Sequence, residues 1–227
     1  MVGILVWILA FVPGIIWLVY VYKKDKLEPE PIGWVILVFI CGALLVPLCV
    51  LIEKPLSSGL GVDTIRTTAD AAKVSWFVAG LVEEGAKFLL VIGLVSYRRT
   101  FNEPMDGIVY AAAAALGFAS AENIIYIKKF GAFVILLRGP LSTLGHMLFS
   151  SIWGYAIGKA KFGRENRLSL LAKGFILSAF FHGLYDFLLF TKVLAALAVY
   201  LVLTTLRKML LRMVAEAQAK SPFAESG

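Results

Sequence analysis

The stretch GLVEEGAKFLLVIG, residues 80–93, places two adjacent carboxylates and an ammonium group inside an apolar run. Each charged side chain at membrane depth costs at least about 2.5–3.5 kcal/mol on insertion scales. The chain around it has 227 residues, of which 60% are hydrophobic and 16% charged, and its mean hydropathy is +0.85. Soluble domains are about 45–50% apolar and about 25% charged. The composition therefore indicates an integral membrane protein, in which Glu83, Glu84 and Lys87 need an explanation.

The other apolar runs are also long enough to cross a bilayer, which takes about 20 residues of helix. We predict an all-α, polytopic membrane protein with about seven transmembrane helices in a single domain over residues 1–227. The predicted spans are residues 2–22, 31–52, 74–97, 107–127, 140–158, 170–190 and 193–206. One longer helix running through Pro140 is the alternative for the fifth span. Asp106, directly before the fourth span, is interpreted as its N-cap.

Basic residues are divided unevenly between the two sides of this topology. The C-terminal end and the loops after the first, third and fifth spans, with their margins, hold 14 Lys or Arg, against 7 on the opposite side. The positive-inside rule then places the N-terminus outside and the C-terminus in the cytoplasm of a plasma-membrane protein. The net charge of +7 is spread over short loops, so it does not indicate nucleic-acid binding.

Ionisable side chains recur at helical spacing in the third to sixth spans. They are Glu83, Glu84 and Lys87 in the third span, Glu122 in the fourth, His146 in the fifth, and His182 and Asp186 in the sixth. At about 1.5 Å of rise per residue, Glu83, Glu122 and both histidines lie roughly 8–14 Å below the predicted outer surface. We therefore predict one shared site in a central four-helix core over residues 74–190. Small residues on the same stripes, such as Gly154 and Gly158, are interpreted as packing positions.

This set of side chains supports hydrolysis in several ways. A carboxylate of Glu83 or Glu84 could activate water while the imidazoles of His146 and His182 stabilise an oxyanion. Histidine and carboxylate ligands could instead hold a divalent metal. A serine mechanism is also open, because Ser150 is four residues after His146. Two alternatives without hydrolysis remain: a proton- or ion-coupled transporter, and a scaffold in which the polar stripes hold helices together.

Four short motifs carry a resemblance to a known family. EEGAK (83–87), FASAEN (118–123), HMLFS (146–150) and HGLYD (182–186) resemble, in this order, the motif set of the PrsW family of intramembrane proteases, which is similar to the CAAX prenyl proteases and the Abi proteins. The resemblance implies a multi-pass protease that cleaves a single-pass membrane protein near the extracytoplasmic side. In the family's best-known role the substrate is an anti-sigma factor. The resemblance also implies that Glu83 and Glu84 are the water-activating group and its partner, with His182 as a catalytic histidine.

Two motifs depart from the CAAX-protease pattern. Glu122 stands where FxxxH has a histidine, and Asp186 stands where HxxxN has an asparagine. Four carboxylates against Lys87 leave a charge of about −3, which a low-dielectric site sustains only with added protons or a divalent cation. Lys87 is expected to keep its neighbouring carboxylate ionised. The cofactor is left open: zinc held by His146, His182 and Glu122, or a metal-free glutamate mechanism.

Overall fold

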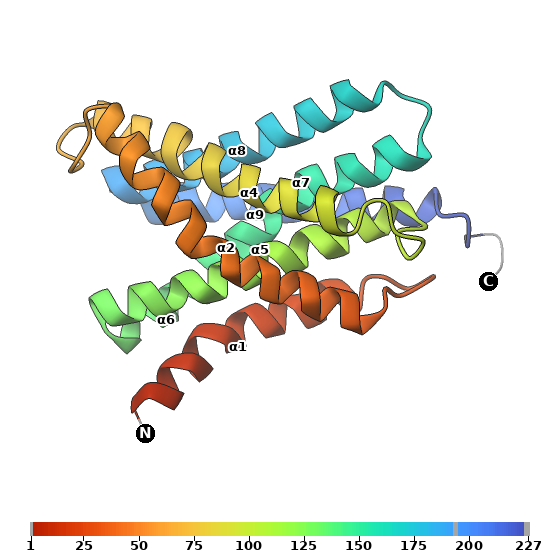
Figure 1. Ribbon diagram of the computed structural model, residues 1–227, viewed down its shortest axis with the longest axis horizontal. Coiled ribbons are helices and arrows are strands. Elements are labelled where there is room, and N and C mark those ends of the chain that lie inside the picture. The colour runs from red at the N-terminus through yellow and green to blue at the C-terminus, as the bar shows by residue number, and fades with distance from the viewer. Residues whose placement is uncertain (1, 193–194, 225–227) are drawn as a thin grey trace.

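The computed structural model describes residues 2–192 and 195–224, and every regular element in this part of the chain is a helix. The all-α prediction is therefore confirmed. The longer helices lie side by side in a bundle (Figure 1). The elements are α1 (Val2–Tyr22), α2 (Ile32–Gly59), α3 (Thr68–Ala72), η1 (Lys73–Gly80), α4 (Leu81–Leu94), α5 (Pro104–Phe130), η2 (Ala132–Val134), α6 (Ile135–Arg138), α7 (Ser142–Phe162), α8 (Arg167–Thr191) and α9 (Ala195–Ala219).

Each predicted span corresponds to helix in the structure, although the predicted start of the seventh, Val193, lies outside the described residues. Within the described part, four helices are long and apolar enough to cross a membrane: Gly3–Tyr22, α2, α5 and α8. The pair of α6 and α7, bent by 42°, counts as a fifth if it is one span. The predicted third span falls short of this test because the π-helix η1 and the shorter α4 divide it.

Several helix ends differ from the prediction. The helix expected to end at residue 52 continues to Gly59 and so includes Glu53. A continuous helix through Pro140 is wrong, because α6 ends at Arg138 and α7 begins at Ser142 after a bend. The prediction of Asp106 as an N-cap is also wrong. Glu103 is the N-cap of α5, and Asp106 is the third helical residue of a capping box.

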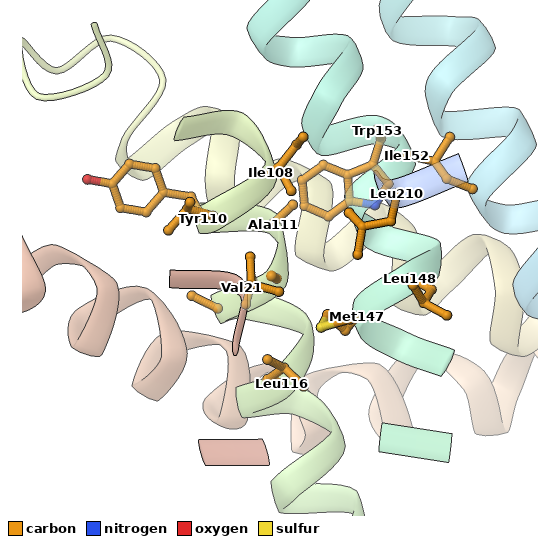
Figure 2. Close-up of a cluster of buried hydrophobic side chains, with 14 of the residues drawn as sticks. Val21, Ile108, Tyr110, Ala111, Leu116, Met147, Leu148, Ile152, Trp153 and Leu210 are labelled. Atoms are coloured by element: carbon orange, nitrogen blue, oxygen red, sulfur yellow. The ribbon is translucent and has the colours of Figure 1, made fainter. Parts of the chain in front are cut away.

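The centre of the bundle is α5, which packs against α1, α2 and α7. Its run of five alanines, 111–115, is completely buried. Ile108 and Ala111 of α5 face the buried indole of Trp153 on α7, whereas Tyr110 extends from another side of the helix (Figure 2). A Cβ built on Gly154 would collide with the backbone of α5, so the packing interpretation of this stripe position is supported. Such small residues let helices associate in lipid through close van der Waals contact.

The two ends of the bundle carry different connections (Figure 1). One end holds the N-terminal part of α1, the α2–α3 connection and α6. The opposite end holds the α1–α2, α4–α5 and α7–α8 loops and the C-terminal part of the chain. The basic residues of the predicted cytoplasmic side belong to this second end.

Candidate active site

The adjacent carboxylates Glu83 and Glu84 lie in the first turn of α4 and face different surroundings. Successive residues of a helix point about 100° apart, so adjacent side chains can face different surroundings. Glu83 lines a cavity of about 180 Å³, and Glu84 is completely buried. Lys87, one turn further along, contacts both: its Nζ lies 2.5 Å from Glu84 Oε1 and 3.8 Å from Glu83 Oε2.

Hydrogen-bond donors from α4, α7 and α8 surround the Glu84 carboxylate. They are Lys87 Nζ (2.5 Å) and His182 Nδ1 (2.9 Å) on Oε1, and Ser150 Oγ (2.7 Å) and Trp153 Nε1 (2.8 Å) on Oε2. Ser178 Oγ also lies 3.0 Å from Oε2, and its one hydroxyl hydrogen is shared with the carbonyl oxygen of Phe149 at 2.7 Å. A carboxylate offers about four lone-pair sites, so these donors saturate it. Ser150 directs its only hydroxyl hydrogen to Glu84, which argues against the serine mechanism with His146.

Glu83 has the opposite environment. Its Oε2 is buried and has no hydrogen-bond donor among the described residues. Three nitrogen atoms lie just beyond hydrogen-bond range of Oε2: His182 Nε2 at 3.7 Å, Lys87 Nζ at 3.8 Å and His146 Nδ1 at 3.9 Å. Glu83 is therefore the carboxylate of the pair that has an oxygen free for a ligand or for a proton.

The hydrogen bonds of the two histidines fix which ring nitrogen carries the lone pair. Since the Glu84 carboxylate only accepts, His182 Nδ1 is the donor in the 2.9 Å contact with it, and the lone pair of Nε2 is free. Likewise His146 Nε2 donates to Glu122 Oε2 at 2.9 Å, and the lone pair of Nδ1 accepts a hydrogen bond from Lys87 Nζ at 3.3 Å. When a histidine binds a metal through one ring nitrogen, the other ring nitrogen often donates its N–H to a carboxylate, as both histidines do here.

Glu83 Oε2 and the lone-pair nitrogens of the two histidines form a group suited to a metal ion. One ligand atom from each of Glu83, His146 and His182 lies within 4.8 Å of the other two, and all three residues are buried. A tetrahedral zinc ion with bonds of about 2.0–2.2 Å keeps its ligand atoms roughly 3.3–3.6 Å apart. The observed separations from Glu83 Oε2, 3.7 and 3.9 Å, are close to this. Glu122, suggested from the sequence as a ligand, instead contacts the far side of the His146 ring.

The remaining predicted residue, Asp186, also lines the cavity. Its Oδ2 lies 3.7 Å from His182 Nε2, and its side chain is 20% exposed, compared with 9% for Glu83. The structure thus brings all seven residues predicted from the sequence into the cavity or directly behind it. Side chains from the four predicted helices therefore lie together around one cavity.

Two charged residues of the cavity were not predicted. Glu53 comes from the unexpected extension of α2, and its Oε1 has no donor within the described part of the chain. Arg138 of α6 is only 9% exposed, although its sequence position suggested a loop cation. Its Nη2 lies 3.2 Å from Glu122 Oε2, and its Nε donates to Asn123 Oδ1 at 3.0 Å. The sequence gives no sign of the two Arg138 contacts, because both depend on tertiary packing.

Counting these residues changes the charge balance of the site. Five carboxylates, Glu53, Glu83, Glu84, Glu122 and Asp186, now lie with two cations, Lys87 and Arg138. Fully ionised, the site still has a formal charge of about −3, so it needs protons or a bound cation in a low-dielectric environment.

Comparison with known proteins agrees with this chemistry. Residues 30–211 match a protein family described as "PrsW family intramembrane metalloprotease". A relative named "Protease PrsW" from Geobacillus kaustophilus (strain HTA426) is 39% identical over 180 residues, which cover 79% of this chain and 77% of the relative. The protein of the same name from Bacillus subtilis (strain 168) is 33% identical over 178 residues, covering 78% of this chain and 79% of the relative.

No solved structure matches the chain. The transporter alternative receives no support from these comparisons, whereas the protease interpretation does. A family match over most of the chain, together with a buried group of histidines and carboxylates on four helices, leads to one assignment: the chain belongs to the PrsW family and is an intramembrane protease.

Proposed function

We propose that this protease holds a zinc ion between Glu83 Oε2, His146 Nδ1 and His182 Nε2. The observation that supports it most is the donor-free, buried Glu83 Oε2, which lies 3.7 Å from His182 Nε2 and 3.9 Å from His146 Nδ1. Three protein ligands with a position left open are typical of hydrolytic zinc sites. A zinc ion would supply a Lewis acid for the scissile carbonyl and for the attacking water.

The other residues of the site take supporting roles in this proposal. Glu84 orients the His182 ring through Nδ1, and Glu122 orients the His146 ring through Nε2. Arg138 neutralises Glu122 and holds it in place. Among the predicted site carboxylates that contact a histidine, Asp186 is the most exposed. We assign it the role of general base, whose Oδ2 accepts a proton from the attacking water.

The proposed substrate is a single-pass membrane protein, of which an anti-sigma factor is one example, and the proposed site of the cut is its extracytoplasmic juxtamembrane end. The cavity lies towards the end of the bundle with the N-terminus: its lining includes Glu53 near the end of α2 and Phe190 near the end of α8. The charge asymmetry of the loops supports a location of this end outside the plasma membrane, by the positive-inside rule. Unwinding a substrate helix inside lipid costs several kcal/mol per unsatisfied backbone group, so a fraying helix end is favoured.

The first experiment measures metal and cleavage together. Purified full-length protein should contain about one zinc per chain, lose cleavage of a tagged single-pass anti-sigma factor on chelation, and regain it with zinc. His146→Ala and His182→Ala should each lose the zinc, whereas Glu165→Gln, at an exposed residue outside the cavity, should retain zinc and activity. Fully active protein without metal would overturn the zinc proposal and make Glu83 Oε2 the base for water.

The second experiment locates the cut. Mass spectrometry of the released fragments, with independently mapped topology of enzyme and substrate, should show cleavage at the extracytoplasmic flank of the substrate helix. A cut on the cytoplasmic flank would contradict the proposed orientation or the proposed access from the N-terminal end.

A further inference from the structure

A second group of buried carboxylates lies at the end of the bundle opposite the active site. Asp25 and Glu30 come from the α1–α2 loop, and Glu103 and Asp106 come from the start of α5. Asp25 is 3% exposed, and the other three are completely buried. Nothing in the protease chemistry derived above uses these groups. A fully buried acidic cluster needs its own explanation, because carboxylates are almost never buried without a partner.

The two loop carboxylates are each anchored through one oxygen only. Asp25 Oδ2 accepts the backbone N–H of Glu30 at 3.3 Å. Glu30 Oε2 accepts the hydroxyl of Tyr110 at 2.5 Å. Asp25 Oδ1 and Glu30 Oε1 are buried and have no donor among the described residues.

The two helix carboxylates repeat this arrangement. Asp106 Oδ2 accepts the backbone N–H groups of Asn102 at 2.6 Å and Glu103 at 2.8 Å, which closes the capping box of α5. Glu103 Oε2 accepts the hydroxyl of Ser221, close to the C-terminus. In the described structure Glu103 Oε1 and Asp106 Oδ1 are likewise buried and lack a donor. Each of the four carboxylates is therefore held in position by one oxygen and leaves the other oxygen unsatisfied.

The cluster is tight enough for three of its carboxylates to share one ligand. One carboxylate oxygen from each of Asp25, Glu103 and Asp106 lies within 4.8 Å of those of the other two. Glu30, the fourth member, interacts electrostatically with the Asp106 carboxyl group, as Asp25 does with that of Glu103. Acceptors facing acceptors repel each other unless a proton or a cation lies between them.

The neighbouring cation does not resolve this. Lys161 interacts electrostatically with Asp106 and Glu30, but its Nζ donates to the carbonyl oxygens of Ser96 at 2.8 Å and Phe101 at 2.6 Å. Four carboxylates against this one ammonium group leave a formal charge of about −3, as in the active site.

We propose that Asp25, Glu30, Glu103 and Asp106 form a second cation site that binds a hard divalent ion, Mg²⁺ or Ca²⁺. The donor set consists of carboxylate oxygens without histidine or cysteine, which is the set that magnesium, calcium and manganese favour over zinc. The ion would join the α1–α2 loop to the first turn of α5. Through Glu103 it would also fix Ser221, and with it the end of α9.

Protons are the competing occupant of the same cluster. With no cation bound, burial raises the pKa of Asp25 to about 8 and that of Glu30 to about 7. Two shared protons, one in each carboxyl–carboxyl contact, would then satisfy the donor-free oxygens without a metal. The two occupants make different predictions for the addition of a divalent ion.

Manganese binding is the direct test, because Mn²⁺ prefers the same oxygen ligands and is visible by electron paramagnetic resonance. Full-length protein is purified in detergent and stripped with a chelator, and His182→Ala is used as the background so that the active site binds no metal. We expect about one immobilised Mn²⁺ per chain, displaced by Mg²⁺ or Ca²⁺. We also expect either ion, at about 100 times its dissociation constant, to raise Tm by roughly 5 °C or more.

Variants locate the bound ion. Glu103→Gln and Asp25→Asn should each weaken Mn²⁺ binding at least about tenfold, the lower end of what loss of a ligand-shell group costs. Glu165→Gln, an exposed acid at the same end of the bundle, should bind Mn²⁺ like the parent. If a cluster variant does not fold, the titration of the parent protein still decides. If the parent protein binds no Mn²⁺ and its Tm does not change with Mg²⁺ or Ca²⁺, the proposal is overturned in favour of shared protons. Unchanged Mn²⁺ binding in both cluster variants would also overturn it.

Discussion

The two buried groups of carboxylates, at opposite ends of the bundle, differ in what lies around them. At the active site, histidines and two cations share the space with the acids, and a cavity of about 180 Å³ gives access to Asp186 and Glu122, whose side chains are 20% and 17% exposed. At the second group, the hydrogen-bond donors are backbone N–H groups and hydroxyls, the neighbouring Lys161 donates to backbone carbonyls instead, and all four acids are buried.

This difference suits the first group to catalysis and the second to a structural role. A group that turns over substrate must exchange water and protons with its surroundings, and it needs side chains that change charge near neutral pH, which histidine provides. A sealed group of oxygen acceptors has neither property. It suits a permanently bound cation or trapped protons that connect chain segments. The same contrast exists on a smaller scale between Glu83, which has a free oxygen, and Glu84, which has none.

The largest effect should come from Glu83→Gln. This change keeps the shape of the side chain and removes the free carboxylate oxygen, so cleavage should fall by roughly 10²–10⁴-fold. The measurement is the rate of substrate cleavage at equal amounts of folded protein. Glu165→Gln is the matched control. Cleavage at the parent rate would break the comparison, because the free oxygen would then have no chemical role.

Glu84→Gln should sharpen the contrast between the two neighbours through stability. The substitution leaves the buried Lys87 without the carboxylate 2.5 Å away and replaces acceptor lone pairs with an NH₂ group among donors. Removing one partner of a buried pair costs about 3–5 kcal/mol. Thermal unfolding in detergent should therefore show a clear loss for Glu84→Gln and a smaller one for Glu83→Gln, whose Oε2 accepts no hydrogen bond in the described structure. Equal losses would mean that the donors around Glu84 contribute little.

Arg138 tests whether the cations of the active site matter beyond charge balance. Arg138→Gln should lower cleavage by about 10–100-fold, since it releases Glu122 and so loosens the His146 ring. Arg138→Lys should restore only part of this, because lysine cannot bond Glu122 and Asn123 with one planar group. Lys129→Gln, at an exposed residue, serves as control. Equal activity of the Gln and Lys variants would exclude a role for the charge.

The smallest effect should come from Asp70, a partly exposed acid. Backbone N–H groups of Arg66 and Thr67 donate to its carboxylate and lower the pKa of Asp70. Because the pKa of Asp70 is lower in the folded than in the unfolded chain, its carboxylate stabilises the helix start when the pH is above the unfolded-state pKa. This contribution is lost as the pH falls through the folded-state pKa. Asp70→Asn should therefore speed amide exchange in residues 67–72 at neutral pH, and the difference from the parent should disappear in acid. A difference that persists in acid would mean that the carboxylate charge is not responsible.

The sequence predicted much of the fold and most of the active site, for physical reasons that are easy to identify. Apolar length identifies the helices, and spacing by four identifies the face on which Glu83 or His182 lies. Spacing within one helix does not show contacts between helices. Arg138 was therefore counted as a loop cation, although it is paired with Glu122. The sealed acidic cluster was missed for the same reason, since Asp25 and Asp106 are distant in sequence and each has an ordinary local interpretation.

Helix η1, the π-helical turn that leads into α4, has a consequence for how the chain tolerates changes of length. A π-helix contains one more residue per closed turn than an α-helix, and such turns are often found beside functional sites. Deleting one residue within 73–80 would let this segment close as an α-helix while α4 and its contacts keep their register. The same deletion inside α4 after residue 84 would rotate Lys87 by about 100° relative to Glu83 and Glu84. Length variation among relatives should therefore be found in η1 and be absent from the four residues after Glu83.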